Sequence, residues 1–551
     1  MATEAKDNFG RNSLILSLGT FASRATGQVR TILLVGAIGT TSLVANSFDI
    51  ANTLPNMLFT LLAAGILQAV MMPQIMQAIK AENTQERLDK LLTISAATLL
   101  GLTIILVAAT PLLIHLFTLA GDWPRDAIVL AVAFGYWCVP QVFFYGLFSL
   151  ISELLNARGQ FAATGWAPVA NNIISVAGFG LFIYLFGSQQ GIGNNLGGWT
   201  WSMTALMGAT ATLGIVIQAS ILLIALRRGG FHWHIRFGLH GIGLRSAGKV
   251  VGWTIAAVIL EQVGLVYLRN ITSAAGQSAV GGEIIAGPAA FTNALTIYIL
   301  PHSLVVVSII TALFPRMSMA AAQGDLWGVR TTMSTGLRSA GVFSVLASVA
   351  MIVLAGPIMK ALLPTLSAEG VAAGAPVLRA LSFGLVALGA TVMVKRMYYA
   401  FEDGRSIFVI QIFATAFMVA VIWIFSHSQP TRYWTIAAAA AYAGAAWISV
   451  LLRVSGMRKK LHGIDGRRIL SLYVRAGIGA LAGGVVAFVI TYVMHGFDPG
   501  LTWLHAVVVT VVAGVSMVAV YVAALRVLKV QELDAALGPI IRRLGRGRGR
   551  G

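Results

Sequence analysis

The chain has 551 residues, of which 57% are hydrophobic and only 10% are charged, and its mean hydropathy is +0.83. A soluble domain of this size cannot cover its surface with so few charged side chains, so these values exclude a soluble protein and indicate a polytopic membrane protein. The net charge of +19 fits this class, because basic loop residues set membrane topology and attract anionic headgroups. We therefore expect membrane lipids, and no nucleic acid, as partners.

Apolar stretches long enough to cross a bilayer recur along the whole chain, separated by short polar segments. They predict an all-α protein with fourteen transmembrane helices. These helices are expected at residues 12–37, 43–71, 91–119, 127–155, 163–187, 200–226, 247–273, 286–313, 333–363, 376–400, 406–427, 433–455, 470–495 and 502–528. No small-residue cleavage site follows the first stretch closely, so we interpret it as a retained helix.

The distribution of charge supports this count. Almost every Lys and Arg of the loops falls on the side of the N-terminus, and the opposite loops contain only Arg125 and Arg432. A missed helix would break this alternation from that point onward. By the positive-inside rule, both termini are predicted to be cytoplasmic.

Three pairs of similar segments indicate an internal repeat. Pro55 and Pro301 lie 246 residues apart in related "LP" segments, and Arg24 and Arg269 lie 245 apart in "SRATGQ" and "RNITSAAGQ". The turns in "LLNARGQFAATGW" and "YYAFEDGRSIF" occur at the same offset. The sequence thus predicts two six-helix lobes related by a parallel repeat, followed by two C-terminal helices. This arrangement is typical of transporters that expose a central site alternately to the two sides.

The repeat divides the chain into five predicted segments. They are an N-terminal lobe at 1–228, an interfacial cytoplasmic linker at 229–246, a C-terminal lobe at 247–460, the two added helices at 461–530 and a basic cytoplasmic tail at 531–551. In the linker, "FHWHIRFGLH" alternates apolar with polar residues, which favours a segment lying flat at the membrane interface over a metal site. No nucleophile with its base or outer-loop carboxylate pair is recognisable, so we expect a secondary transporter and no enzyme.

Arginines inside the predicted helices are the strongest functional signal. Arg24 and Arg30 lie in the first helix, and Arg269 lies in the repeat-related seventh. An arginine at a helix centre costs roughly 2.5–3.5 kcal/mol, which a water-filled cavity with a cationic wall would avoid. Because a guanidinium matches phosphate oxygens, such a cavity indicates an anionic, phosphorylated substrate. The alternative is that these residues only pair with buried acids, for example Arg24 with Asp49.

Other polar residues and prolines are secondary candidates. Those of the second helix that could line the cavity are Asn46, Asp49 and Asn52. Candidates for gating or for coupling to Na⁺ or H⁺ are Glu261, Pro55 and Pro301. In the fifth helix, Asn171 and Asn172 are expected to join helices. "GLRSAGKV" has Val250 where a phosphate-binding loop has the magnesium-holding Ser or Thr, so we expect no nucleotide binding. We also expect no cofactor and no bound metal.

The segments "SRATGQVR", "GTTSLVANSFDIANTLPN" and "LLNARGQFAATGWAPVANN" resemble the MurJ/MviN lipid II flippases of the multidrug/oligosaccharidyl-lipid/polysaccharide exporter superfamily. The resemblance implies a V-shaped pair of lobes around a cationic cavity, with a groove for a polyprenyl tail beside helices 13 and 14. It also implies a protein of the bacterial cytoplasmic membrane that moves the undecaprenyl-diphosphate-linked peptidoglycan precursor to the outer leaflet. Nothing demands more than a monomer, and cell-wall synthesis proteins are candidate partners.

The resemblance carries over to individual positions only in part. The two first-helix arginines of the family match Arg24 and Arg30. Its second-helix acid falls on Asn46, and Asp49, about one turn later, is a candidate substitute.

Two further arginines of the family are absent. Their positions fall near Phe59 or Thr60 in the second helix and near Thr296 in the eighth, so we hypothesise that Arg269 supplies the missing positive charge. The alternative functions are a flippase for another polyprenyl-linked polysaccharide unit and a membrane scaffold that has lost transport.

Overall fold

The computed structural model describes residues 2–62, 84–158, 160–192, 195–238, 248–277, 285–401, 403–530 and 532. Every regular element in these ranges is helical, which confirms the all-α class. A helix satisfies its own backbone hydrogen bonds, as a lipid environment requires. Among the described residues, 11 helical segments are long and apolar enough to cross a membrane, or up to 12 if the bent pair at 368–400 is one span. The predicted helices 1 and 2 are not among these segments, so the count of fourteen stays a prediction that the structure fits.

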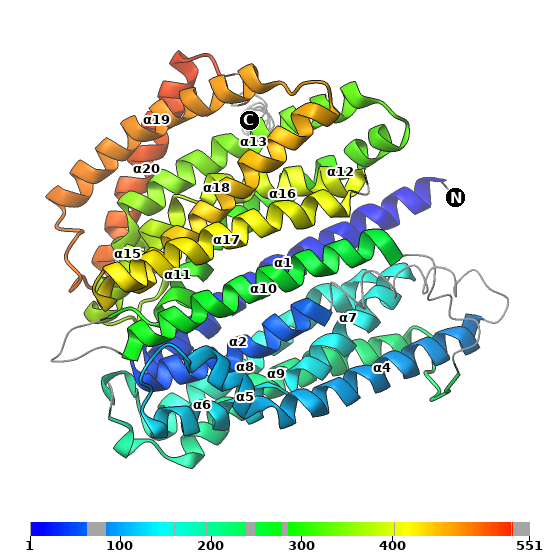
Figure 1. Ribbon diagram of the computed structural model, residues 1–551, viewed down its shortest axis with the longest axis vertical. Coiled ribbons are helices and arrows are strands. Elements are labelled where there is room, and N and C mark those ends of the chain that lie inside the picture. Colours follow the sequence, from blue (N-terminus) through cyan, green and yellow to red (C-terminus); the bar gives the residue numbers. More distant parts are fainter. Residues whose placement is uncertain are drawn as a thin grey trace, which may run out of the picture. The chain divides into compact units, whose positions relative to one another are not determined.

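The chain divides into two compact units, and the first covers Met1–Ser278. Its elements are α1 (Ala2–Ile38), α2 (Leu43–Leu62), α4 (Thr84–Ala108), α5 (Thr110–Thr118), α6 (Arg125–Cys138), α7 (Gln141–Ala157), α8 (Phe161–Phe186), η2 (Gln190–Ile192), η3 (Leu196–Gly198), α9 (Trp201–Arg228) and α10 (Gly248–Gln277). Helix α1 packs along α8, α8 packs along α9, and α2 lies against α6 (Figure 1).

Helix α10 belongs to this first unit, and the lobe boundary at residue 247 stays a prediction. It packs against α2 and α5. The Asn270 side chain donates a hydrogen bond to the Leu116 carbonyl (2.6 Å) and accepts one from the Ala120 N–H (2.8 Å). These bonds join α10 to the C-terminal end of α5, whose last carbonyls have no helical partner. How function divides along the chain stays a prediction.

The second unit covers Ala279–Gly551. Its elements are α11 (Pro288–Pro301), the π-helix η4 (His302–Val306), α12 (Val307–Ala322), α13 (Leu326–Val353), α14 (Ala355–Leu362), α15 (Ala368–Ser382), α16 (Leu385–Ala400), α17 (Gly404–Ser428), η5 (Thr431–Tyr433), α18 (Trp434–Lys460), α19 (Gly466–Val493) and α20 (Trp503–Val527). Helices α19 and α20 pack together, and α19 also lies against α13 (Figure 1).

Several predicted spans are interrupted, and prolines lie at some of the breaks. Pro111 lies in the first turn of α5, Pro140 precedes α7, and Pro301 precedes the π-helix. Proline lacks an N–H and its ring clashes with the carbonyl four residues earlier, so a straight helix cannot continue unchanged. The α15–α16 pair bends by 45° at its break.

Helix ends carry the polar residues that an interface favours. Side chains of Thr200, Asp325 and Asp403 accept hydrogen bonds from the first turns of α9, α13 and α17. The last turns of α9 and α18 are basic, which stabilises the negative end of the helix dipole.

Residues 231–238, which we call the strap, run without regular structure along α4. The fully buried Asp89 of α4 accepts a hydrogen bond from the His234 N–H (3.0 Å) and pairs with the His234 ring (3.4 Å). The Trp233 indole donates to Thr93 (3.1 Å). The strap is therefore anchored to α4, and linker residues 239–246 lie outside the described part of the chain. Within the described part, no three His, Cys, Asp or Glu side chains are grouped to hold a metal.

Candidate functional site

Close packing against α8 fixes the orientation of α1, the helix that carries the first two arginines. A Cβ added at Gly19 would lie 2.7 Å from the Gly165 carbonyl oxygen, so only glycine allows the two backbones to approach so closely. Further along, the Asn172 side chain donates to the Ser23 carbonyl (2.7 Å). The predicted helix-joining role of Asn172 is confirmed, and Asn171 likewise donates to Gln218 of α9 (3.0 Å).

Arg24 and Arg30 are both partly buried on α1. Arg30 follows Ser23 by seven residues, so it lies on nearly the same face of the helix, two turns further along. It interacts electrostatically with Tyr145 of α7, whose ring packs against Phe59 of α2 (5.6 Å between centroids). Arg24 directly follows Ser23 and therefore lies about 100° round the helix. The two arginines project from different faces of α1.

Helix α2 adds a polar stripe to this cluster. Asp49, Asn52 and Asn56 recur at a spacing of three and four residues, which places them on one face. Asp49 and Asn52 are partly buried, and Asn56 hydrogen-bonds to Tyr145, near Arg30. Asn46, the position that matches the family's acid, is fully buried in this conformation. The accessible polar surface of α2 is therefore the stripe that begins at Asp49.

The partner of Asp49 is Arg269 of α10. The Arg269 Nη1 lies 2.8 Å from the Asp49 Oδ2, and the two side chains are only 9% and 12% exposed. The sequence offered Arg24 as an example of a partner for Asp49, and the structure shows an ion pair of Asp49 with Arg269. Breaking a buried ion pair is destabilising, so a change at either residue should weaken the contact between α2 and α10. This pair and the Asn270 contacts connect α10 to α2 and α5.

The predicted gating and coupling residues are more widely spread. Glu261 is partly buried on α10, eight residues before Arg269, or about 12 Å along the axis. Pro55 lies within the unbroken helix α2. Pro301 ends α11, where the π-helix bonds the Val307 N–H to the His302 carbonyl. Such π-turns are frequent at functional sites, and the roles of these residues stay predictions.

The positions where the family carries two further arginines hold uncharged side chains. Phe59 packs against Tyr145, and the Thr60 hydroxyl bonds to the Asn56 carbonyl of its own helix (2.7 Å). The Thr296 hydroxyl similarly bonds to the Thr292 carbonyl (2.9 Å). The positive charge found beside the α2 stripe comes instead from α1 and α10.

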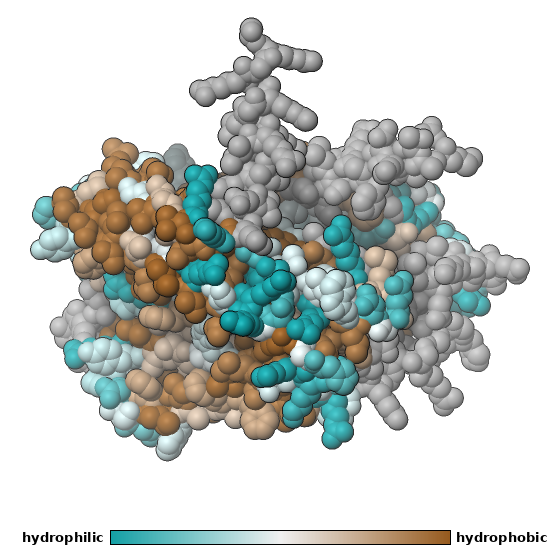
Figure 2. Space-filling view, turned by 90° about the horizontal axis from the view of Figure 1, so that it is seen from above, coloured by the Kyte–Doolittle hydropathy of each residue, from teal (hydrophilic) through white to brown (hydrophobic). Residues whose placement is uncertain are grey.

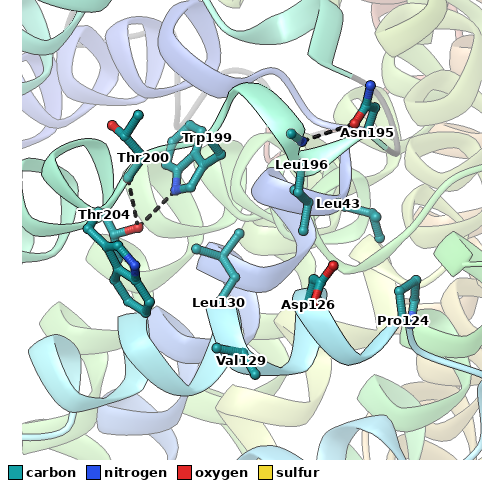
Figure 3. Close-up of a pocket in the computed structure, with 12 residues that line it drawn as sticks. Leu43, Pro124, Asp126, Val129, Leu130, Asn195, Leu196, Trp199, Thr200 and Thr204 are labelled. Carbon is teal, nitrogen blue, oxygen red and sulfur yellow. Dashed lines mark hydrogen bonds between the residues drawn. The ribbon is translucent and has the colours of Figure 1, made fainter.

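A cavity of about 490 Å³ lies where α2, α6 and α9 begin (Figure 3). Asp126 and Leu130 of α6 line it on one side, and the segment around Asn195 and Trp199 lies opposite. The Trp199 indole donates to Thr204 (2.8 Å), which fixes that wall. None of the predicted ligand residues lines this cavity.

The fold and these charged residues define a class before any comparison is made. Charged side chains inside a bundle of membrane-spanning helices mark substrate or ion pathways, because they are costly to retain otherwise. A polytopic helical protein with partly buried arginines on α1 and an ion pair between α2 and α10 is a membrane transporter by these criteria.

The family model described as Lipid II flippase MurJ matches residues 35–508, and the chain belongs to this family. It is 22% identical over 410 residues to the probable lipid II flippase MurJ of Rickettsia prowazekii, covering 73% of this chain and 76% of that relative. It is 25% identical over 408 residues to the lipid II flippase MurJ of Burkholderia cenocepacia, covering 72% and 74%. Members of the family are transporters, so the expectation that the chain is no enzyme is confirmed.

Solved structures show the same fold. A lipid II flippase MurJ in an inward closed conformation matches with a TM-score of 0.69 at 17% identity, covering 93% of this chain and 99% of that one. An inward-facing multidrug resistance MATE family transporter of the MOP superfamily matches with a TM-score of 0.56 at 19% identity, covering 79% and 98%. The protein is thus a multi-pass membrane protein with a MurJ-like fold.

Proposed function

We propose that this protein moves lipid II, the undecaprenyl-diphosphate-linked peptidoglycan precursor, from the inner to the outer leaflet by alternating access. The observation that carries this proposal is the pair of arginines held on α1 by its packing against α8, in a chain of the Lipid II flippase MurJ family. Flippases of that name act on lipid II, and a guanidinium binds phosphate oxygens through paired N–H donors.

In this mechanism, Arg24 and Arg30 bind the diphosphate, and Arg269 exchanges partners. Asp49 neutralises Arg269 in the substrate-free state, which avoids an isolated charge. A bound diphosphate competes with the Asp49 carboxylate for Arg269 and loosens the connection between α2 and α10. Substrate binding and the position of α10 are thereby coupled.

The remaining features of the proposal concern orientation and energy. Both termini lie in the cytoplasm of a bacterium, and the transporter acts as a monomer, with cell-wall synthesis proteins as partners. A membrane potential contributes about 2.3 kcal/mol per charge per 100 mV, which favours outward movement of an anionic headgroup. Glu261 is the candidate for binding Na⁺ or H⁺. The polyprenyl tail runs beside α19 and α20.

Complementation tests this function. A strain depleted of its own lipid II flippase is supplied with the parent chain, with Arg24→Ala or with Arg30→Ala, and membrane levels are checked by immunoblot. We expect growth with the parent and a loss of viability of at least a hundredfold with either variant. Failure of a well-expressed parent would instead favour another polyprenyl-linked glycan or a scaffold that does not transport.

A further inference from the structure

A second concentration of positive charge lies far from the α1 arginines in sequence, in the second unit. A cavity of about 560 Å³ is lined by side chains from α13, from the start of α19 and from the residues that follow α20. Its charged lining residues are Arg338, Arg467, Arg468, Arg475, Lys529 and Glu532. We call this cavity the basic pocket.

The charges of the basic pocket do not balance. Glu532 forms an ion pair with Arg338, and both side chains are largely buried. Asp465 approaches Arg468 only to 3.9 Å. Arg467, Arg475 and Lys529 add three more positive charges around one cavity. Like charges gathered around one cavity repel each other, and an anion bound between them would reduce that repulsion.

The chain after α20 is folded back to complete this pocket. Val530 is buried in a cluster with Leu472 of α19 and Val342 of α13, and the Val530 N–H bonds to the Leu525 carbonyl (3.0 Å). The Arg475 guanidinium donates to the Leu528 carbonyl (3.1 Å). The buried anchor at Val530 thus holds its neighbour Lys529 at the edge of the pocket.

Lys529 has a left-handed backbone conformation, which is unusual for a lysine. Its φ is +54°, the left-handed conformation that ends many helices and that glycine adopts most easily. A lysine there costs backbone energy, although its charge also stabilises the end of the helix dipole. Arg338 gives a second sign of an incomplete site, because its buried Nε has no hydrogen-bond partner among the described residues.

An apolar surface begins beside the pocket. Large side chains on α19 are exposed at intervals of three or four residues, which places them on one face: Leu470, Val474, Ile478, Leu481 and Val485. Figure 2, seen from the side on which α19 lies in Figure 1, shows extensive brown, hydrophobic surface adjoining teal, hydrophilic residues. A lipid whose chains lie along α19 would bring its headgroup to the level of the basic pocket.

We propose that the basic pocket binds the phosphate group of an anionic lipid, at the membrane face where α19 begins and α20 ends. The guanidinium groups of Arg467 and Arg468 and the Lys529 ammonium contact the phosphate oxygens, and the acyl chains follow the apolar face of α19. This site is built only from residues of the second unit, and its existence does not depend on which substrate the transporter carries.

The test measures binding of fluorescent dioctanoyl phosphatidylglycerol to the purified full chain in neutral detergent. The pocket variant combines Arg467→Gln, Arg468→Gln and Lys529→Gln. The control combines Arg458→Gln, Lys459→Gln and Arg526→Gln, which removes three exposed positive charges at the ends of α18 and α20 but outside the pocket. We expect at least a tenfold loss of affinity in the pocket variant and less than a twofold change in the control. Equal losses in both, or equal binding of phosphatidylcholine by the parent, would overturn the proposal.

A second variant separates binding from folding. Lys529→Gly relieves the left-handed strain and removes one charge, so we expect a higher apparent melting temperature together with weaker phosphatidylglycerol binding. A purely structural Lys529 would leave lipid binding unchanged, which would contradict the assignment.

Competitors identify the source of the phosphate. Displacement of the probe by undecaprenyl phosphate at lower concentration than by phosphatidylglycerol would assign the site to a polyprenyl lipid, and the reverse order would assign it to a membrane phospholipid. Either result supports a lipid phosphate. Saturable micromolar binding of inorganic pyrophosphate, with phosphatidylglycerol unable to compete, would assign the pocket to a soluble anion and overturn the proposal.

Discussion

Arg269 and Asp49, which lie 220 residues apart in the chain, form an ion pair with a 2.8 Å separation between the Arg269 Nη1 and the Asp49 Oδ2. The pair joins α10 to α2, beside the stripe of polar residues that runs along α2. The sequence had proposed the two residues for separate roles. Asp49 was the candidate to replace the family's second-helix acid, and Arg269 was the candidate to replace the two absent family arginines. Its disruption should therefore affect both stability and transport.

Breaking this pair should be more harmful than reversing it. Asp49→Asn or Arg269→Gln breaks an ion pair in a largely buried position, at a cost of about 3 kcal/mol. The double variant Asp49→Arg/Arg269→Asp restores opposite charges and should recover at least half of the lost apparent melting temperature. Thermal unfolding of the purified proteins in detergent measures this. Additive losses in the double variant would show that the two residues do not interact.

Glycine at position 19 should be required by the α1–α8 contact. Gly19→Ala places a Cβ 2.7 Å from the Gly165 carbonyl oxygen and should destabilise the protein by about 1–3 kcal/mol. Gly180→Ala on α8 is the matched control, since no atom lies within 4 Å of its added Cβ, and it should be neutral or stabilising by up to about 1 kcal/mol. Similar melting temperatures for both variants would argue against close packing of these helices.

The strap should be released by the loss of one buried carboxylate. Asp89→Ala removes the acceptor of the His234 N–H and the partner of the His234 and Arg236 side chains. Trypsin cleavage after Arg236, mapped by mass spectrometry, should become at least fivefold faster. Thr98→Ala changes an exposed hydroxyl that bonds only within α4 and should leave the rate unchanged. Unaltered cleavage in the Asp89 variant would show that the strap is held by other contacts.

Asp403, the N-cap of α17, should make the free energy of unfolding depend on pH only in the acid range. Partial burial of Asp403 raises its pKa. Hydrogen bonds from Lys460 and Ser406 lower the pKa by a larger amount, so the net pKa lies below its usual value. A depressed folded-state pKa contributes stability above the unfolded pKa of about 4, and this is lost as the pH falls through the folded value. Asp403→Asn keeps a capping oxygen but removes the charge, so it should lower the melting temperature equally at pH 5.5 and pH 8.

Two further measurements complete that test. The deficit of Asp403→Asn should shrink below about pH 4, as the parent carboxylate itself becomes protonated. Asp403→Ala, which also removes the cap, should cost about 1 kcal/mol more near neutral pH. A deficit that grows on acidification would contradict the sign of this pKa shift.

The sequence predicted most of the helices because hydropathy is a local property. It did not predict the α6–α7 break at Pro140. It singled out Pro301, but not the π-helix that follows it, because that geometry depends on how neighbouring helices accommodate a missing backbone hydrogen bond. The role of Asn172 as a contact between helices was predictable because a polar amide in an apolar helix needs a partner.

The pairings within the site were harder to predict. The sequence left the partner of Asp49 open, and the ion pair with Arg269 forms because α10 packs against α2. The anchoring of the strap could not be predicted from the sequence either. Only the structure shows that Asp89, an acid near the start of α4, is completely buried. The basic pocket combines residues from α13, from α19 and from the segment after α20, and the positive-inside rule alone accounts for their charge without bringing them together.

The most direct test of the central claim is lipid II translocation in proteoliposomes. Purified parent protein, Arg24→Gln and Arg30→Gln would be reconstituted with fluorescent lipid II in the presence of a membrane potential, and accessibility of the headgroup to a quencher would be followed over time. The account predicts protein-dependent translocation by the parent and at least a tenfold lower rate in each variant, with unchanged melting temperatures. Equal rates in the parent and both variants would contradict a phosphate-binding role for the α1 arginines, and a parent that moves no lipid II would contradict the proposed function itself.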